Sequence, residues 1–370
     1  MSHKFLVIDP FIHLSEHTLV DRSFIEFFSQ YDSIFLVNQE MKNKCLDLKG
    51  RFIPSFIDFK YLSKFIRLLN REIIKTSYTI GILILNLFMR RNVVFLAMSQ
   101  LQYAILGTIC YIFRFKVSIV MHHYSEAIIK KKDNLTFGDR IFLLGIKMFS
   151  ISKNTNFIYL SKHIKNTFEL NNISITDRNF FINHPIPLSF IKRIPFSYPK
   201  NNVTKIATIG LLSKKSKSSD KINELAHNSN VELWAIGRLS SSTEFELDKR
   251  IKTKLWRGMY SIEEFESSIS SIDFFIYFFN SEQYQCTASG TLIDAILYNK
   301  GVLCLENKAA ISMLENYNNK YIFNSIDDMN SFLEVNTITN ICDKIDSRMT
   351  YCLLSETCPD TNLVKLWARL

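Results

Sequence analysis

Short apolar runs alternate with longer helical patterns along the chain. In the first half, helical stretches such as SFIEFFSQ and SQLQYAILGTICYIFR lie between runs of strand length. The strands expected there are 4–9, 33–38, 93–98, 117–122, 157–161 and 180–184. Continuous apolar strands separated by helices are typical of a parallel sheet buried on both faces. We therefore predict an N-terminal Rossmann-like domain over residues 1–185.

The pattern stops at a proline-rich stretch and then restarts. Four of the seven prolines lie between 185 and 199 without periodicity, so we predict a linker over 186–203. The strands expected after it are 205–210, 231–237, 254–258, 273–278, 301–306 and 321–324. The prediction is an α/β fold of two doubly wound parallel-sheet domains facing across a cleft. The second domain spans 204–355, and a C-terminal helix within 356–370 packs back on the first.

Composition agrees with two folded domains. The chain has 370 residues, 47% of them hydrophobic, and a net charge of +10. A basic surface suits anionic partners, although frequent Lys and Asn also follow from an AT-rich genome. The seven cysteines are scattered without a C-x-x-C pair, which favours a reducing, cytoplasmic compartment and neither metal binding nor a disulfide framework.

Membrane contact is the remaining question that composition raises. The N-terminus MSHKFLVIDPF is a short apolar strand and not a signal peptide. The longest apolar run, 79–89, is shorter than the roughly 20 residues of a membrane-spanning helix. Apolar and basic residues mix in 65–75, 88–92, 111–116 and 128–132, which fits either peripheral contact with an anionic membrane or helices with a solvated basic face.

A ligand is expected at the carboxyl ends of the parallel strands. In the second half, Gly210, Gly237 with Arg238, and Arg257 with Gly258 stand there, although the chain has only ten glycines. Glycine at such a position lets a backbone approach another group closely.

The stretch TASGT, residues 287–291, leads into a helix expected to begin near Gly290. Bare amides at a helix N-terminus attract a phosphate, and the Ser289 and Thr291 hydroxyls add donors. Asp294, one turn further, is placed to accept hydrogen bonds from a ribose diol. The same residues also fit a T-x-x-D capping box, which would make Asp294 purely structural.

These residues resemble a known family. IATIGLLSKKSK (206–217), ELWAIGRL (232–239), LWRGMYSIEEFESSISSIDFFIYF (255–278) and TASGTLIDAILYNKGVLCLE (287–306) resemble the donor-binding domain of two-Rossmann-domain (GT-B) glycosyltransferases of bacterial surface-polysaccharide pathways. The first half is similar only in strand order and in the His that ends VSIVMHH. The resemblance implies a cytoplasmic glycosyltransferase, possible at the inner face of the membrane, that moves a sugar from a nucleotide-sugar donor to a glycan or polyprenyl-linked acceptor in O-antigen or capsule synthesis.

The resemblance also assigns residues. It implies Asp294 as the ribose-binding acid, Ser289, Gly290 and Thr291 as the diphosphate-binding turn, and Arg257 to Tyr260 as the loop beside the nucleobase. Lys214 or Lys217 would face the donor diphosphate, and His122 would lie near the transferred sugar. The family's E-x7-E pattern is incomplete, because Cys286 stands at its first acid, and Leu211 replaces the usual Arg after the first glycine.

No metal or cofactor is expected, because a helix N-terminus and a lysine can stabilise the leaving diphosphate and no D-x-D cluster is evident. Candidates for the base on the acceptor are His122, His17, Asp9 and His13, each equally open to a structural role. Two alternatives stay open: a non-hydrolysing sugar-nucleotide epimerase of the same fold, and a non-enzymatic basic nucleic-acid-binding protein, for which no recognition motif is present.

Overall fold

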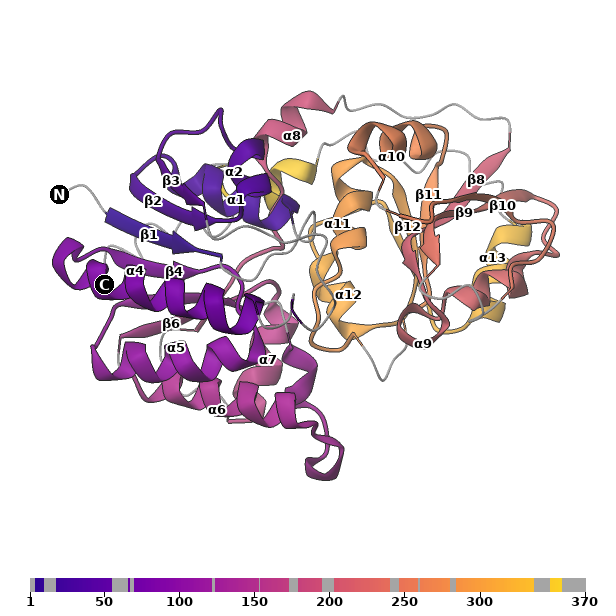
Figure 1. Cartoon of the computed structure of the whole chain (residues 1–370). Helices are drawn as coiled ribbons and strands as arrows, with labels where there is room; N and C mark the ends of the chain where they lie inside the picture. The colour runs from indigo at the N-terminus through magenta and orange to yellow at the C-terminus, as the bar shows by residue number, and fades with distance from the viewer. Residues whose placement is uncertain are drawn as a thin grey trace. The chain divides into compact units, whose positions relative to one another are not determined.

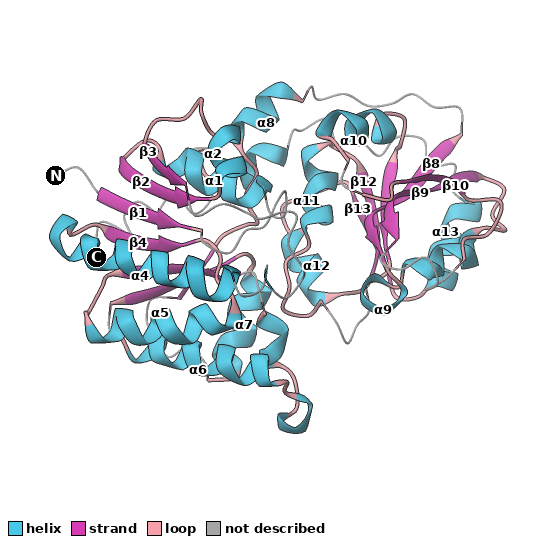
Figure 2. Ribbon diagram, viewed as in Figure 1, coloured by secondary structure: helices cyan, strands magenta, loops and turns pink. Residues whose placement is uncertain are grey.

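The computed structural model describes residues 4–9, 18–54, 66, 70–121, 124–152, 154–172, 179–194, 203–239, 246–258, 260–279, 284–335 and 347–354. It divides the chain into two compact units. The first unit contains residues 1–189 and 349–370, and the second contains 190–348. Each unit is built on one parallel sheet (Figures 1 and 2).

The first unit has a seven-stranded sheet in the order β3-β2-β1-β4-β5-β6-β7, with every pair parallel. The strands are β1 Lys4–Ile8, β2 Asp32–Val37, β3 Arg51–Pro54, β4 Asn92–Phe95, β5 Val117–Met121, β6 Thr155–Tyr159 and β7 Asn179–Phe181. The helices are α1 Thr18–Phe28, α2 Gln39–Lys44, α4 Thr76–Met89, α5 Gln100–Ile112, α6 Phe137–Ile151, α7 Lys162–Leu170 and α8 Leu188–Arg193. Strand order reverses direction between β1 and β4, as in a doubly wound fold.

The second unit repeats this plan with six strands in the order β10-β9-β8-β11-β12-β13, again all parallel. The strands are β8 Thr204–Leu212, β9 Val231–Leu239, β10 Lys252–Leu255, β11 Phe274–Tyr277, β12 Gly301–Leu305 and β13 Lys320–Phe323. The helices are α9 Lys214–Lys217, α10 Ile262–Ile269, α11 Gly290–Leu297, α12 Lys308–Met313 and α13 Ile326–Val335. The order reverses between β8 and β11, which makes their carboxyl ends the expected ligand position.

The predicted fold class is confirmed: both units are α/β domains with parallel sheets, and each expected strand overlaps an observed one. Apolar side chains on both faces of the strands build the cores, as the burial of Phe5, Leu6, Val7 and Ile8 along β1 shows. The edge strand β3 was not predicted. That the two domains face one another across a cleft stays a prediction.

Two segments between and after the units differ from a plain linker and tail. Helix α8 lies within 186–203, and Glu26 of α1 accepts hydrogen bonds from the backbone amides of Leu188 and Ser189 at its start. After the second unit, the Ile186 amide donates to the Tyr351 oxygen at 2.9 Å, so the chain returns to the first unit. The C-terminal helix expected within 356–370 lies outside the described residues.

Among the described residues, one helical segment is long and apolar enough, by length and composition, to cross a membrane. It runs from Glu72 to Met89 and so begins seven residues before the apolar run at 79–89. A third of this segment is buried inside the protein, and α4 connects β3 to β4 of the same sheet.

Candidate functional site

The candidate site lies at the carboxyl ends of β8 and β11, where two glycines allow close approaches. Gly210 and Gly237 are paired in register on β8 and β9, and both have positive φ, 85° and 143°. A Cβ on Gly237 would lie 1.9 Å from the Gly210 oxygen, so this glycine serves the contact between strands. A Cβ on Gly210 would lie 2.7 Å from Thr291 Cγ2 and 3.7 Å from Lys217 Nζ. Gly210 therefore brings α11 and Lys217 together over the strand.

Helix α11 begins at Gly290, as predicted, and its first turn is open. Gly290 is exposed, and a Cβ there would meet no atom within 4 Å. The amides of Gly290 and Thr291 have no hydrogen bond to a described residue, whereas the Ser289 amide donates to the Met313 sulfur at 3.4 Å. The Ser289 hydroxyl lies 3.0 Å from that of Thr291. Two of the three predicted amides are thus available to a ligand.

The capping-box alternative for Asp294 is wrong. The N-cap residue is Ser289, its side chain makes no capping hydrogen bond, and Thr291 already lies inside the helix. Asp294 therefore lies beyond the N3 position that a capping box requires, because that position is counted from Ser289. The Asp294 carboxylate is therefore not needed to cap the N-terminus of α11.

Lys217 and Asp294 are the two charged groups of the site, and both are only partly exposed. Burial raises the pKa of Asp294 to about 7, against the opposing effect of the Lys217 charge. Burial likewise lowers the pKa of Lys217 to about 8, against the effect of Asp294. Neither side chain has a hydrogen bond or an ion pair to a described residue. Two desolvated opposite charges without direct partners are typical of a site that awaits a ligand.

Lys214 is arranged differently from Lys217. Its side chain is mostly exposed, and its ammonium lies 3.8 Å from Asp220. The single turn of α9 accounts for the difference, because the Lys217 amide bonds back to the Ser213 oxygen and turns its side chain toward Gly210. Of the two lysines, the structure brings only Lys217 to the other predicted residues.

An aromatic group borders Asp294 on the side of β10. The centroid of the Tyr260 ring lies 4.4 Å from that of Trp256 and 5.6 Å from that of Phe265. Burial raises the pKa of Tyr260, the Asp294 charge raises it further, and Arg238 opposes both. Arg238 and Arg257 are exposed. The predicted loop from Arg257 to Tyr260 thus reaches the site through Tyr260, and Met259 lies outside the described residues.

Sequence reasoning missed two tyrosines whose pKa the Asp294 charge affects. The Tyr277 hydroxyl donates to the Thr291 oxygen at 2.6 Å and fixes the start of α11 over β11. Burial, and then the Asp294 charge, raises the pKa of both Tyr277 and Tyr298. Tyr277 ends a strand, so the rule that selected the strand-end glycines could have found it. Tyr298 carries no such signal, because it follows α11.

In the first unit, the structure describes one of the predicted catalytic residues. Asp9 follows β1 and is buried, and its amide donates to the Leu36 oxygen at 2.8 Å. Burial, and then the Asp9 charge, raises the pKa of Asp21 well above its usual range. A pair of buried carboxyl groups thus follows β1. His122, His17 and His13 lie outside the described residues and stay predictions.

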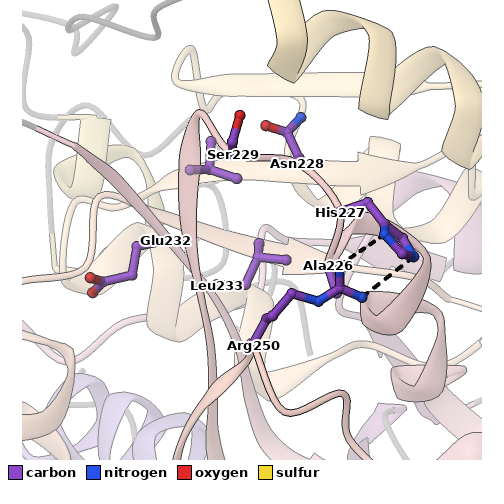
Figure 3. A pocket seen from close by; sticks show the side chains of 8 residues that line it. Ala226, His227, Asn228, Ser229, Glu232, Leu233 and Arg250 are labelled. Carbon is purple, nitrogen blue, oxygen red and sulfur yellow. Dashed lines mark hydrogen bonds between the residues drawn. The ribbon is translucent and has the colours of Figure 1, made fainter.

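A separate pocket lies at the opposite, amino end of β9 (Figure 3). Arg250 lines this pocket, and its guanidinium lies 2.8 Å from Nδ1 of His227. Glu232, which also lines it, forms an ion pair with Lys252. This pocket contains none of the predicted site residues. Within the described part of the chain, no group of three His, Cys, Asp or Glu side chains could hold a metal ion.

Comparison with known proteins supports the fold. No protein-family model matches the sequence, and no curated protein matches it. Among solved structures, HepE (Alr3699) of Anabaena with UDP and glucose is similar over 90% of this chain and 89% of its own, with TM-score 0.59 and 11% identity. A Rickettsia africae glycosyltransferase is similar over 100% of this chain and 96% of its own, with TM-score 0.58 and 11% identity. Sucrose-phosphate synthase of Thermosynechococcus elongatus is similar over 90% of this chain and 88% of its own, with TM-score 0.59 and 10% identity.

This chain has the GT-B fold. The two parallel-sheet units and the likeness over nearly all of each neighbour establish that architecture. The resemblance stated for the second half of the sequence therefore extends, at the level of fold, to both domains. At this identity the likeness concerns the fold alone, and the activity is argued from the residues of the site.

Proposed function

We propose that the chain is a glycosyltransferase that moves a sugar from a nucleotide-sugar donor to a glycan or lipid-linked acceptor. One observation carries the proposal. Lys217 and Asp294, both desolvated and without direct partners among the described residues, lie beside the open first turn of α11 at the switch point of the second sheet. The neighbour HepE, which has the same fold, was solved with UDP-glucose.

The chemistry of the site fits the parts of a nucleoside diphosphate sugar. The amides of Gly290 and Thr291, with the positive end of the helix dipole, bind the diphosphate, and the Lys217 ammonium neutralises it. Asp294, in its ionised form, accepts hydrogen bonds from the ribose hydroxyls. Tyr260, which contacts Trp256 and stacks on Phe265, offers an aromatic edge beside the nucleobase.

In the transfer step, the acceptor oxygen bonds to the anomeric carbon while the bond from that carbon to the diphosphate oxygen breaks. Negative charge grows on the leaving diphosphate, and Lys217 with the α11 amides stabilises it. We propose that this needs no metal, so that activity survives a chelator. The acceptor proton passes to a base of the first domain, for which His122 is the first candidate, His17 the second and Asp9 the third.

The pathway and location are proposals of a further step. The resemblance of residues 206–306 to surface-polysaccharide enzymes supports O-antigen or capsule synthesis in the cytoplasm, with a polyprenyl-linked or growing glycan as acceptor. Both would be tested by the product formed on extracted lipid-linked acceptors. Incorporation of labelled sugar into a lipid-soluble product is the expected result.

The test of the donor site is binding and hydrolysis across a panel of UDP, GDP, CMP and dTDP sugars. We expect one nucleotide class to raise the melting temperature, and both Asp294→Ala and Lys217→Ala to abolish the shift. Lys214→Ala is the matched control and retains it, because Lys214 faces solvent and Asp220.

Three results would count against the proposal. Absence of any nucleotide shift together with salt-sensitive duplex binding would indicate a nucleic-acid-binding protein. Interconversion of two free sugar nucleotides would indicate the epimerase. A shift that survives Asp294→Ala and Lys217→Ala would place the donor elsewhere.

A further inference from the structure

Helix α4 is apolar on the face that its own domain leaves uncovered. Its buried residues, Thr76, Thr79, Ile82, Leu83 and Asn86, recur at helical spacing and face the sheet. On the opposite side, Phe88 is 83% exposed, Leu85 55% and Ile84 47%. The helix contains no charged side chain from 76 to 89. A helix that is apolar all round is normally buried on all sides, so another surface is expected to cover this face.

The exposed strip continues onto the next helix. α4 and α5 lie side by side on one face of the first sheet (Figures 1 and 2), and both end at its amino edge, before the paired strands β4 and β5. The Val93 amide bonds the Lys116 oxygen at 2.9 Å, which joins the two ends. Here Ile112 is 62% exposed, and Tyr111 and Phe113 nearly half. Single exposed apolar residues are ordinary, but a strip built by two adjacent helices is not.

The two helices and the turns that follow them carry charge of one sign. Residues 76–116 contain four basic side chains and no acidic one. Arg91 is paired with Asp32 at 3.1 Å. Arg90, Arg114 and Lys116 follow the two helices directly, are exposed, and have no ion pair to a described residue.

We propose that the outer face of α4 and the end of α5 form a docking face for an anionic lipid bilayer. The helix, about 21 Å long, lies in the plane of the interface with Leu85 and Phe88 in the acyl boundary. Arg90, Arg114 and Lys116 contact lipid phosphates. A second copy of the chain fits less well, because a twofold interface would set the same cations against one another. The proposal does not depend on the donor site of the second unit.

The experiment is flotation of the full chain with vesicles of phosphatidylcholine mixed with phosphatidylglycerol, and with vesicles of phosphatidylcholine alone. We expect binding to the anionic vesicles that falls as salt rises. The variant Arg90→Asn/Arg114→Asn/Lys116→Gln should weaken it roughly a hundredfold, about fivefold for each cation. Asn is chosen for the two arginines because both have φ near 52°.

A second variant, Leu85→Gln/Phe88→Gln, removes the apolar contact and should weaken binding at least about tenfold. Leu170→Gln is its control, because Leu170 is equally exposed, at 83%, on α7. Each variant must keep the wild-type melting temperature and nucleotide response, which separates this test from that of the donor site.

Four results would overturn the proposal. Equal binding to both vesicle types would remove the role of the cations. Wild-type binding by Leu85→Gln/Phe88→Gln would remove the role of the strip. Absence of vesicle binding, with a dimer that this variant dissociates, would indicate self-association. Resistance of the native protein to alkaline carbonate extraction would indicate that residues 72–89 span the bilayer.

Discussion

Lys217 sets the upper pH limit of donor binding in the proposed site. Burial lowers its pKa to about 8, so the ammonium loses its proton as the pH rises through that value. The affinity for the nucleotide sugar that the panel identifies should therefore fall above about pH 8, by up to roughly tenfold for each further pH unit. Lys217→Arg keeps its charge throughout, and titration calorimetry should show no such fall. The same fall in both proteins would assign it to another group.

Asp294 should lower stability in the absence of ligand. Its folded pKa of about 7 lies above the usual value of 3.8. Between these values the unfolded chain has lost a proton that the folded protein retains, so stability falls as pH rises through this window and stays lowered above it. Asp294→Asn should therefore melt higher than the wild type near pH 8 and show no such gain near pH 4.

The same substitution should weaken binding of the nucleotide sugar that the panel identifies roughly tenfold or more, because an amide accepts less strongly from the ribose hydroxyls. Greater stability combined with weaker binding is the signature of a group kept for function. If Asp294→Asn melts lower than the wild type near pH 8, the carboxylate is structural.

At the level of elements, the pairing of β8 with β9 depends on two glycines. Gly237→Ala should destabilise the protein by roughly 2–4 kcal/mol, because its Cβ would strike the Gly210 oxygen and its φ is 143°. Gly258→Ala is the control, since a Cβ there meets nothing within 4 Å. Urea unfolding should separate the two variants. A similar free energy of unfolding for both would show that the strands move apart at no cost.

Strands were predictable from sequence where their side chains are buried, and least at the two exposed edge strands β3 and β10. β12 is a buried run without polar side chains and β1 is apolar after Lys4, and both were located within a residue. β3 and β10 end the two sheets, and their side chains are largely exposed, so no continuous apolar run marks them. β3 was missed, and β10 was expected two residues late.

The site was predictable in position but not in detail. The rule for parallel sheets led to Gly210 and to the start of α11, because strand ends can be read from the apolar pattern. The choice between Lys214 and Lys217 depends on one short turn, and the position of Tyr298 depends on packing. Neither is visible in hydrophobic periodicity. The capping box was misread because the N-cap residue is Ser289 and not Thr291.

For the whole molecule, the second unit is an uninterrupted segment, whereas the first is completed by residues from both sides of it. Tyr351 and Cys352 are fully buried, and besides the Tyr351 bond to Ile186, the Thr350 oxygen accepts from Asn183 at 3.3 Å. Removal of residues 349–370 should therefore destabilise the first unit by at least about 3 kcal/mol, from lost apolar burial and two hydrogen bonds.

Calorimetry of this truncated chain should show two transitions. The first unit melts earlier than in the full protein, and the second, which keeps Lys217, Asp294 and all of α11, melts as before. The nucleotide sugar that the panel identifies should raise only the second transition, because a ligand stabilises the unit that binds it. A nucleotide sugar that raised the first transition instead would move the donor site to the other domain. Equal lowering of both transitions would mean that the two units unfold together.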